Sequence, residues 1–422
     1  MEGLFKNTQN LIHDEGFIIR SKTDGSAFTR RRKLDFKSLI FSLMSFTRPG
    51  VQTELDRFFK SLSKGASFES VSKSAFTQSR RKLKPEAFIE LNSEQLQYFL
   101  DNAPHQKNWK QNRVVAVDGS LLNLPHTEEV KKVFGGVKNQ HEEVISARCS
   151  FAYDVCNELV LDAQIAPRRS CEKELAVNHL AQLNPQKDIL VFDRGYPCQW
   201  LMGLLVQRGF KFCFRLSTAW KKAHQLMETS DDIDWTLIRS SDREWGKLKT
   251  YGLSRTLGGL RLLSIPLNHK EKEVLVTNLT DRSAYSVDDL KSLYHLRWGV
   301  EEGYKSFKKT LHIEHFTGKS PQAIRQDFHA KVFMLNMASM VRTQSVNPTL
   351  KKENYQASKT QTLAKVKDFL IDLFYGKSLK KKIKLIIELL RKRIEMIRPQ
   401  RSYPRSCTSS RRRHKITNSK GI

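Results

Sequence analysis

The chain has 422 residues and carries 73 lysines and arginines against 44 aspartates and glutamates, a net charge of +29. This length supports two or three domains with a sizeable core, and so large a positive surplus favours a polyanionic partner, first of all nucleic acid. An anionic membrane is the competing partner, but no apolar run approaches the ~20 residues that a membrane-spanning helix needs, so we expect no membrane partner.

The cysteines and the first residues of the chain indicate in which cellular compartment the protein is expected. Six cysteines are scattered singly, without a Cys-x-x-Cys pair, which predicts neither a structural zinc site nor a disulfide framework. The first residues lack the charged and then apolar order of a signal peptide. We therefore expect a soluble, cytoplasmic protein.

The first 105 residues have the apolar periodicity of helices and few β-rich runs. Helices are predicted at Leu34–Phe46, Gln52–Leu62 and Val71–Leu83. The second and third are joined through a turn at Gly65, and the third carries Arg80 and Arg81. This pair suits a helix-turn-helix that contacts DNA through the two arginines. An ordinary helical pair with a solvated basic face is the open alternative.

The pattern changes near Arg113, where short β-branched and aromatic runs begin. Strands are predicted at 113–118, 145–155, 159–166, 189–193 and 211–216, with helical patterning at Glu172–Leu183 and Gln199–Arg208. This order predicts an α/β layer structure with some parallel pairing. Residues 218 to about 280 interrupt it with glycine turns and with β-like pieces at Trp235–Arg239, Leu260–Pro266 and Val274–Asn278.

Helical patterning returns at Val287–Leu311 and at Ala323–Arg342. After Gly376 the chain is strongly basic: Leu379–Ile397 can form a basic amphipathic helix, and the composition beyond Pro399 predicts disorder. The predicted regions are a helical N-terminal DNA-binding region at 1–105, the first part of a core at 106–218, a β-rich insertion at 219–280, the second part of the core at 281–345, and a basic helical C-terminal region with a disordered tail at 346–422.

Two apolar runs each end on an aspartate: Asp118 follows four apolar residues, and so does Asp193. If the two strands are parallel neighbours, both carboxylates emerge at the same edge of the sheet, where ligands and catalytic groups gather in open α/β sheets. The alternative is that each aspartate merely opens a turn or caps a helix.

The predicted helix from Val287 carries a third acid. At about 100° per residue, a helix places four of its polar side chains within about 60° of one another: Tyr294, Arg297, Glu301 and Lys308. A carboxylate there can ligate a metal, and the cations and the phenol can clamp phosphates. The alternative is a solvated face with ion pairs. Glu302 turns about 80° away from Tyr294 at this helical period and is the weaker candidate.

These residues resemble the Tyr-(2)-Arg-(3)-Glu-(6)-Lys signature of bacterial insertion-sequence transposases with an Asp-Asp-Glu triad. Asp118, in Val117-Asp118-Gly119-Ser120, resembles the first acid of that family, and Asp193, in Phe192-Asp193-Arg194-Gly195-Tyr196, resembles the second. The spacing of 108 residues from Asp193 to Glu301 fits members with a β-rich insertion before the glutamate. The resemblance implies a ribonuclease-H-like α/β catalytic core, flanked by helical N-terminal and basic helical C-terminal regions.

The resemblance further implies a DNA transposase that cleaves insertion-sequence ends and transfers the strands into target DNA by cut and paste. Asp118, Asp193 and Glu301 would be the catalytic residues and hold two Mg²⁺ ions, for which Mn²⁺ can substitute. The partners would be double-stranded DNA of the element ends and the target, bound by a homodimer at the bacterial nucleoid. The expected DNA contacts are Tyr294, Arg297, Lys308, Arg194, Trp298, Arg80 and Arg81.

Two alternatives stay open. A structure-selective nuclease on the same ribonuclease-H-like core would share the three acids but would not join strands to a target. A non-catalytic basic nucleic-acid-binding protein would explain the charge, but it leaves the spacing of the signature to coincidence.

Overall fold

The computed structural model describes residues 1–30, 32–46, 50–63, 70–102, 106–138, 140, 143–229, 232–238, 242–266, 272–345, 355–376 and 378–396. The turn expected at Gly65 and the tail expected to be disordered beyond Pro399 lie outside the described residues.

The N-terminal region is helical, as its apolar periodicity predicts. Asp14, Asp35 and Ser72 each cap a helix by accepting a hydrogen bond from a backbone N–H group in the first turn, which satisfies one of the donors that a helix start leaves free. The last helix of the predicted helix-turn-helix ends at Arg80, earlier than expected. The six helices are α1 Glu2–His13, α2 Glu15–Ser21, α3 Phe36–Ser45, α4 Val51–Leu62, α5 Lys73–Arg80 and α6 Glu86–Asn102.

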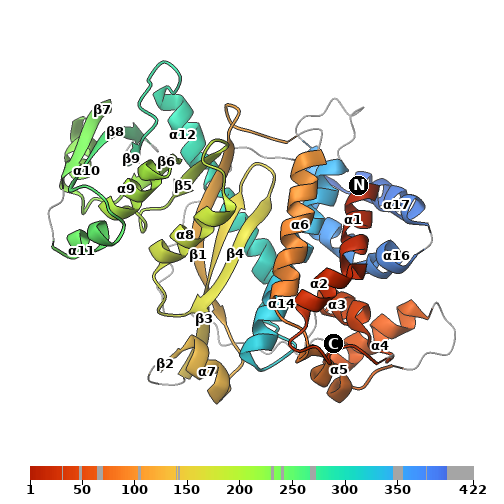
Figure 1. Ribbon diagram of the computed structural model, residues 1–422. Helices are drawn as coiled ribbons and strands as arrows, with labels where there is room; N and C mark the ends of the chain where they lie inside the picture. Colours follow the sequence, from red (N-terminus) through yellow and green to blue (C-terminus); the bar gives the residue numbers. More distant parts are fainter. Residues whose placement is uncertain are drawn as a thin grey trace.

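The central layer is a nine-stranded sheet with the strand order β2-β3-β1-β5-β6-β9-β8-β7, in which β4 also pairs with β3 (Figure 1). The strands that come first in the chain form one half of this sheet. There β1, β3 and β4 form an antiparallel meander, and β5 and β6 lie on the other side of β1 and run parallel to it. Parallel neighbours need crossover connections, which α8 and α9 supply. This is the arrangement expected of a ribonuclease-H-like core, so the predicted α/β fold class is confirmed. The elements are β1 Arg113–Asn123, α7 Glu128–Phe134, β2 Gly136–Lys138, β3 Glu143–Asp154, β4 Leu159–Pro167, α8 Glu172–His179, the 3₁₀ turn Leu180–Gln182, β5 Asp188–Phe192, α9 Gln199–Gln207 and β6 Lys211–Leu216.

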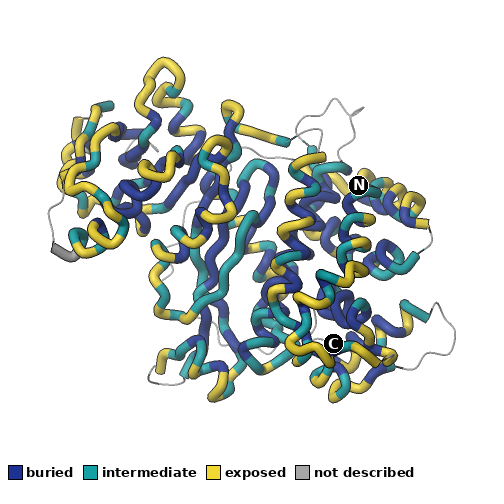
Figure 2. The backbone as a smooth tube through the Cα atoms, viewed as in Figure 1, coloured by how far each residue is buried: buried dark blue, intermediate teal, exposed yellow. Residues whose placement is uncertain are grey.

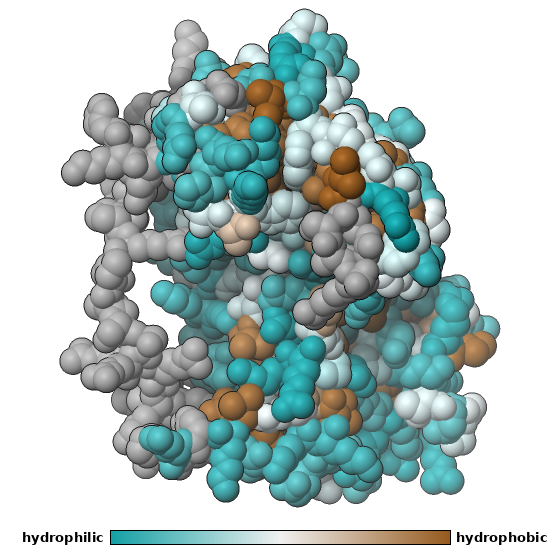
Figure 3. All heavy atoms as spheres, turned by 90° about the vertical axis from the view of Figure 1, so that its left-hand side faces the viewer, coloured by the Kyte–Doolittle hydropathy of each residue, from teal (hydrophilic) through white to brown (hydrophobic). Residues whose placement is uncertain are grey.

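The insertion extends this sheet. Strand β9 pairs antiparallel with β6, and β8 and β7 follow it outward. The expected strands are present, but two helices on this part of the chain were not predicted. Seen from the insertion, the molecular surface is mainly hydrophilic with scattered apolar spots (Figure 3). The elements are α10 Lys221–Thr229, β7 Asp232–Ile238, α11 Asp242–Thr250, β8 Thr256–Pro266 and β9 Lys272–Thr277.

The long helix predicted at Val287–Leu311 is divided into three pieces, so the expectation of one continuous α-helix is wrong. The chain passes from α12 to α13 through a turn at Arg297 and Trp298, whose N–H groups donate to the residue three positions earlier, and α13 runs into a π-helical segment. Such tightened and π-helical segments are frequent at functional sites. The pieces are α12 Val287–Leu296, α13 Gly299–Lys305 and the π segment Ser306–Thr310.

Glycines let α13 approach the sheet closely. A Cβ on Gly303 would lie 3.0 Å from the ring of Tyr153, and a Cβ on Gly299 would lie 3.1 Å from Cβ of Val155. Both distances are shorter than ordinary side-chain packing permits, so the helix could not lie this near β3 with larger residues at these positions.

The C-terminal region completes the helical layer. In α17, Leu379, Ile383, Ile386 and Leu390 are buried, as expected for the predicted amphipathic helix. The helix ends at Arg391 instead of Ile397, because the chain then forms β11, which pairs with β10. The elements are α14 Pro321–Gln344, β10 Tyr355–Ala357, α15 Lys359–Asp368, α16 Leu370–Tyr375, α17 Leu379–Arg391 and β11 Ile394–Met396.

Helix α14 is the centre of the molecule. It lies between the sheet and the other helices, and it is buried along almost its whole length (Figure 2). One hydrophobic cluster joins the N-terminal helices, one face of the sheet and the C-terminal helices, whereas a second cluster lies under α8, α9 and the insertion. The two terminal regions therefore share one core. Among the described residues, no helix is both long and apolar enough to cross a membrane.

Candidate active site

Strand pairing brings the first two acids together. Strands β1 and β5 are parallel neighbours in which Val117 is paired with Phe192, so Asp118 and Asp193 each directly follow a paired residue. Side chains alternate between the faces of a strand, and Val114, Ile189 and Val191 pack in the cluster under α12. Asp118 and Asp193 therefore lie on this same face of the sheet.

Asp118 is not at the end of its strand, although the sequence predicts the strand to stop there. Beyond Asp118, β1 continues to Asn123 because its antiparallel pairing with β3 persists, with Asp118 opposite Phe151 and Asn123 opposite Ser146. The aspartate thus stands where the parallel pairing to β5 ends but the antiparallel pairing continues, which holds its backbone on one side and leaves its side chain half-buried.

The carboxyl group of Asp118 interacts electrostatically with both other acids, Asp193 and Glu301. The pKa of its carboxyl is raised to about 6: burial is the main cause, the neighbouring carboxylates of Asp193 and Glu301 add to it, and the N–H of Gly119 and Arg297 oppose it. That N–H donates to Oδ1 of Asp118 at 2.8 Å. Three like charges gathered in a partly desolvated place are unfavourable without a cation, which is typical of a functional site.

Arg297 is the cation that the chain itself places among these acids. Its Nη2 lies 3.1 Å from Oε1 of Glu301. Burial lowers the pKa of Arg297, but Tyr294, Asp193 and Glu301 outweigh that effect, so its pKa is raised. The turn between α12 and α13 positions this guanidinium, which is only 4% exposed.

Three buried donors around the acids lack an acceptor. Nε of Arg297 and the hydroxyls of Tyr294 and Tyr196 make no hydrogen bond with any residue that the structure describes. A buried donor left without a partner costs about 1–3 kcal/mol. Such a group is expected where a ligand supplies the missing acceptor, and a phosphate oxygen would serve.

The donor chemistry fits a divalent cation, since carboxylate oxygens are the ligands that hard ions prefer. Glu301, however, is engaged by Arg297. Within the described part of the chain, no group of three or more His, Cys, Asp or Glu side chains is arranged to hold a metal ion. The three acids are therefore close enough to interact electrostatically, without forming a closed ligand set.

The remaining predicted contacts of this region lie around the acids. Lys308 is half-buried, and its Nζ donates to the carbonyl oxygen of Leu121 at 2.7 Å, which attaches the π segment to β1. Trp298 is 39% exposed, and the guanidinium carbon of Arg297 lies 4.7 Å from the centre of its ring. Arg194 is exposed beside Asp193.

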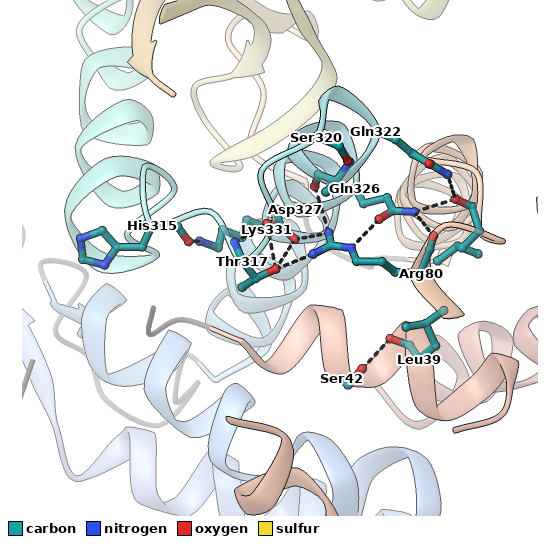
Figure 4. A network of polar contacts seen from close by, with 12 residues as sticks. Leu39, Ser42, Arg80, His315, Thr317, Ser320, Gln322, Gln326, Asp327 and Lys331 are labelled. Atoms are coloured by element: carbon teal, nitrogen blue, oxygen red, sulfur yellow. Dashed lines mark hydrogen bonds and ion pairs between the residues drawn. The ribbon is translucent and has the colours of Figure 1, made fainter. Parts of the chain in front are cut away.

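Arg80 does not belong to a DNA-contact surface, and that prediction is wrong. The side chain is 3% exposed, and its guanidinium is surrounded by partners from α14 and the segment before it (Figure 4). It donates to Asp327 and Thr317 at 2.8 Å, to Gln326 at 2.9 Å and to the carbonyl oxygen of Ala323 at 3.0 Å. Arg81 is exposed and stays a prediction.

Two residues near the acids were not predicted from the sequence. The hydroxyl of Tyr304 donates to the carbonyl oxygen of Asp118 at 2.7 Å; its position three residues after Glu301 is the one signal that could have suggested it. Glu273 lies on β9, and burial raises its pKa, with Asp193 adding to this and Arg215 and Arg297 opposing it. Nothing in the sequence reveals that β9 pairs beside the core strands.

The chain is similar in sequence to one curated transposase and matches one solved transposase structure. The chain is 24% identical over 284 residues to the transposase InsG for insertion sequence element IS4 of Escherichia coli (strain K12), a match that covers 63% of this chain and 60% of that relative. The chain thus matches less than two thirds of the length of this relative. A match to the cryo-EM structure of a piggyBac transposase synaptic complex with hairpin DNA covers 91% of this chain and 84% of the chain in that structure, with a TM-score of 0.46 and 11% sequence identity.

The family described as "Transposase DDE domain" matches residues 109–337. That stretch is more than half of the chain, and it contains Asp118, Asp193 and Glu301. The chain therefore belongs to the DDE transposase family.

Proposed function

We propose that this protein is a DNA transposase, which cleaves the ends of an insertion sequence in a metal-dependent reaction and joins them to target DNA by cut and paste. The observation that carries the proposal is that Asp118 and Asp193 each directly follow the last residue pair of two adjacent parallel strands, and that Asp118 interacts electrostatically with Asp193, Glu301 and Arg297. These residues lie in the stretch that matches the family.

Asp118, Asp193 and Glu301 would hold the divalent ions, Mg²⁺ in the first instance with Mn²⁺ as a substitute. Bound ions of this kind supply Lewis-acid activation of the attacking oxygen and neutralise charge on the leaving oxygen. Asp118 has a raised pKa, so a neighbouring cation would favour its ionised form.

The donors without partners would bind the DNA backbone at the cleaved end. Arg297 and Tyr294 are held beside the acids by the turn between α12 and α13, and a phosphate oxygen would satisfy Nε of Arg297 and the hydroxyl of Tyr294. Lys308 and Arg194 would add positive charge near the same phosphates, and the exposed ring of Trp298 would offer a stacking face for a base.

Transposition joins two element ends, so we propose that a homodimer acts on double-stranded DNA. The high positive charge, +29 over the chain, suits contact with two duplexes, the element ends and the target. The N-terminal helices and the basic C-terminal region would contribute to end recognition, with Arg81 as one contact.

The decisive experiment compares Glu301→Ala with Glu302→Ala. Glu302 is the exposed neighbour, and its carboxylate pairs with Lys305 on the same helix. Residues that hydrogen-bond to a metal ligand and orient it are worth about 10–100-fold in activity, so loss of a direct ligand should lower Mg²⁺-dependent cleavage of labelled element ends by at least about 100-fold. Both variants should bind these ends as the wild type does.

Wild-type cleavage by Glu301→Ala would refute the assignment. A second arm supplies a target plasmid: joined products separate a transposase from a nuclease that only cuts.

A further inference from the structure

A basic hollow lies in the N-terminal region, between the loop that follows α2 and the end of α5. Its volume is about 260 Å³, and its lining includes Arg30, Arg32 and Lys82. None of these three side chains forms an ion pair or a hydrogen bond with any residue that the structure describes. Asp35 is the acid in the lining, and it accepts the capping hydrogen bond at the start of α3.

The hollow is built on a fixed frame. The N–H of Thr23 donates to the carbonyl oxygen of Lys82 at 3.0 Å, and the N–H of Lys84 donates to that of Ser21 at 2.8 Å. In the loop itself, Phe28 has a positive φ of 59°, which costs energy in a residue with a side chain. Its ring packs edge-on against Phe36 at 5.5 Å, and this contact holds the strained turn in place.

We propose that this hollow binds a backbone phosphate of duplex DNA. Small-molecule pockets are typically about 300–1,000 Å³, so this one is small for an organic ligand and suits a single phosphodiester. Three cations face it against one carboxylate, and Ser79 also contributes to its lining. Arg80, two residues before Lys82, turns inward instead (Figure 4). This inference rests on the proposed function, because it assigns part of the DNA contact.

The test uses the full chain with Arg30, Arg32 and Lys82 all changed to Gln. The charge-matched control changes Lys60, Lys132 and Lys187 to Gln; these exposed lysines lie in α4, in α7 and in the turn before β5. Each phosphate neutralised contributes about 0.9 to the slope of log affinity against log salt. The hollow variant should therefore lose at least about 0.9 of slope, equally for an element-end duplex and an unrelated duplex.

A wild-type slope in the hollow variant, or an equal loss in the control, overturns the inference. Calorimetry with inorganic phosphate is the second probe: phosphate binding that the variant abolishes, without any effect on the duplex, also overturns it. If the wild type neither binds nor cleaves element ends, the proposed function itself fails.

A second, independent observation concerns the backbone of Asp118. Its carbonyl oxygen accepts from the hydroxyl of Tyr304 at 2.7 Å and from Oγ of Ser150 at 3.4 Å. Tyr304 comes from α13, where its ring stacks on Phe151 at 4.5 Å. Ser150 precedes Phe151 on β3, so its side chain points to the opposite face of the sheet. The carbonyl group is thus held from both faces.

Ser150 is itself held by a buried chain of polar groups. Its Oγ lies 2.8 Å from Nε2 of His179 on α8, and Nδ1 of His179 lies 2.6 Å from Oδ2 of Asp162 and 3.0 Å from Nε2 of Gln164. A serine, a histidine and an aspartate in this order resemble a nucleophilic triad. Ser150 and His179, however, are both 0% exposed, so no substrate can reach the hydroxyl.

We infer that Tyr304 and the Ser150–His179–Asp162 chain are positioning residues, which fix the backbone of Asp118 so that its carboxylate is held in place for the metal. A ligand held loosely costs affinity, because the supporting contacts orient it. This inference also rests on the proposed function.

Tyr304→Phe removes one hydroxyl and keeps the ring. Tyr153→Phe is the matched control: Tyr153 is also buried against α13, but its hydroxyl makes no hydrogen bond within the described residues. Tyr304→Phe should raise the Mg²⁺ concentration for half-maximal cleavage about tenfold, and speed backbone hydrogen exchange in the peptide that contains Asp118. Adding Ser150→Ala should increase both effects.

Tyr153→Phe should match the wild type in both measurements, and DNA binding should be unchanged in all variants. The inference fails if Tyr304→Phe behaves as the wild type, or if Tyr153→Phe behaves as Tyr304→Phe. Hydrogen exchange is measured without DNA or metal, so it reports on the inference even if cleavage is absent from the wild type.

Discussion

Two arginines of this protein are almost equally buried but differ in how many of their donors have a partner. Arg80 is 3% exposed and Arg297 is 4% exposed. Arg80 donates to four different groups, one of them the carboxylate of Asp327. Arg297 has one ion pair, to Glu301, and its Nε has no partner among the described residues. Burial alone therefore does not distinguish a structural cation from a functional one; the satisfaction of its donors does.

The groups around Arg80 and around Arg297 also differ in how completely they are hydrogen-bonded. Around Arg80, polar groups of α14 close a complete network that joins α5 to the central helix. Around Arg297, three acids and the phenol of Tyr294 interact with one guanidinium, and burial raises the pKa of Asp118 and Tyr294. In the first region the chain itself supplies a partner for each donor, whereas the second leaves Nε of Arg297 and the hydroxyl of Tyr294 without a hydrogen-bond partner among the described residues. Replacements should accordingly affect folding in the first region and activity in the second.

The largest expected effect is on folding, from Arg80→Met. This change leaves the carboxylate of Asp327, which is 2% exposed, without its cation, and breaking a buried pair in this way costs about 3–5 kcal/mol. Urea unfolding should show that loss, whereas Arg81→Met should lie within about 0.5 kcal/mol of the wild type. DNA cleavage per folded molecule should be unchanged. A small change in stability for Arg80→Met would break the comparison.

Arg297→Gln should act on activity instead. The variant retains a polar side chain but loses the charge between Glu301 and Asp193, so we expect cleavage of element ends to fall about 100-fold, as for removal of one preorganised donor at a reacting group. The free energy of unfolding should change by less than it does in Arg80→Met. If the two variants lose equal stability and activity, the distinction between the regions does not hold.

The smallest effect is a gain in stability from Asp118→Asn, measured without divalent ions. The pKa of Asp118 is raised in the folded state to about 6, so the folded protein binds the proton more tightly than the unfolded chain. The carboxyl therefore stabilises the fold fully below its unfolded pKa, and this contribution is lost as the pH rises through 6.

At neutral pH the charged Asp118 destabilises the fold by about 1–2 kcal/mol, allowing for its partial exposure. Asp118→Asn should thus be more stable than the wild type at pH 7 and similar to it near pH 4, and it should not cleave DNA. Urea unfolding at the two pH values measures this. A variant that is less stable at neutral pH would show that Asp118 serves the fold.

Local sequence determined much of this protein. The apolar runs before Asp118 and Asp193 encode buried strands, and the capping residues Asp35 and Ser72 begin helices. These features depend on side-chain periodicity and on hydrogen bonds over a few residues, so they can be predicted without tertiary contacts.

Tertiary structure decided the rest. Arg80 looks like a surface cation in the sequence and becomes internal because α5 packs on α14, far away in the chain. Tyr304, Ser150 and Glu273 reach the acids only through strand pairing and through the close approach that Gly299 and Gly303 allow. The π segment turns Lys308 to the backbone of β1. Such outcomes follow from long-range packing, which no local pattern encodes.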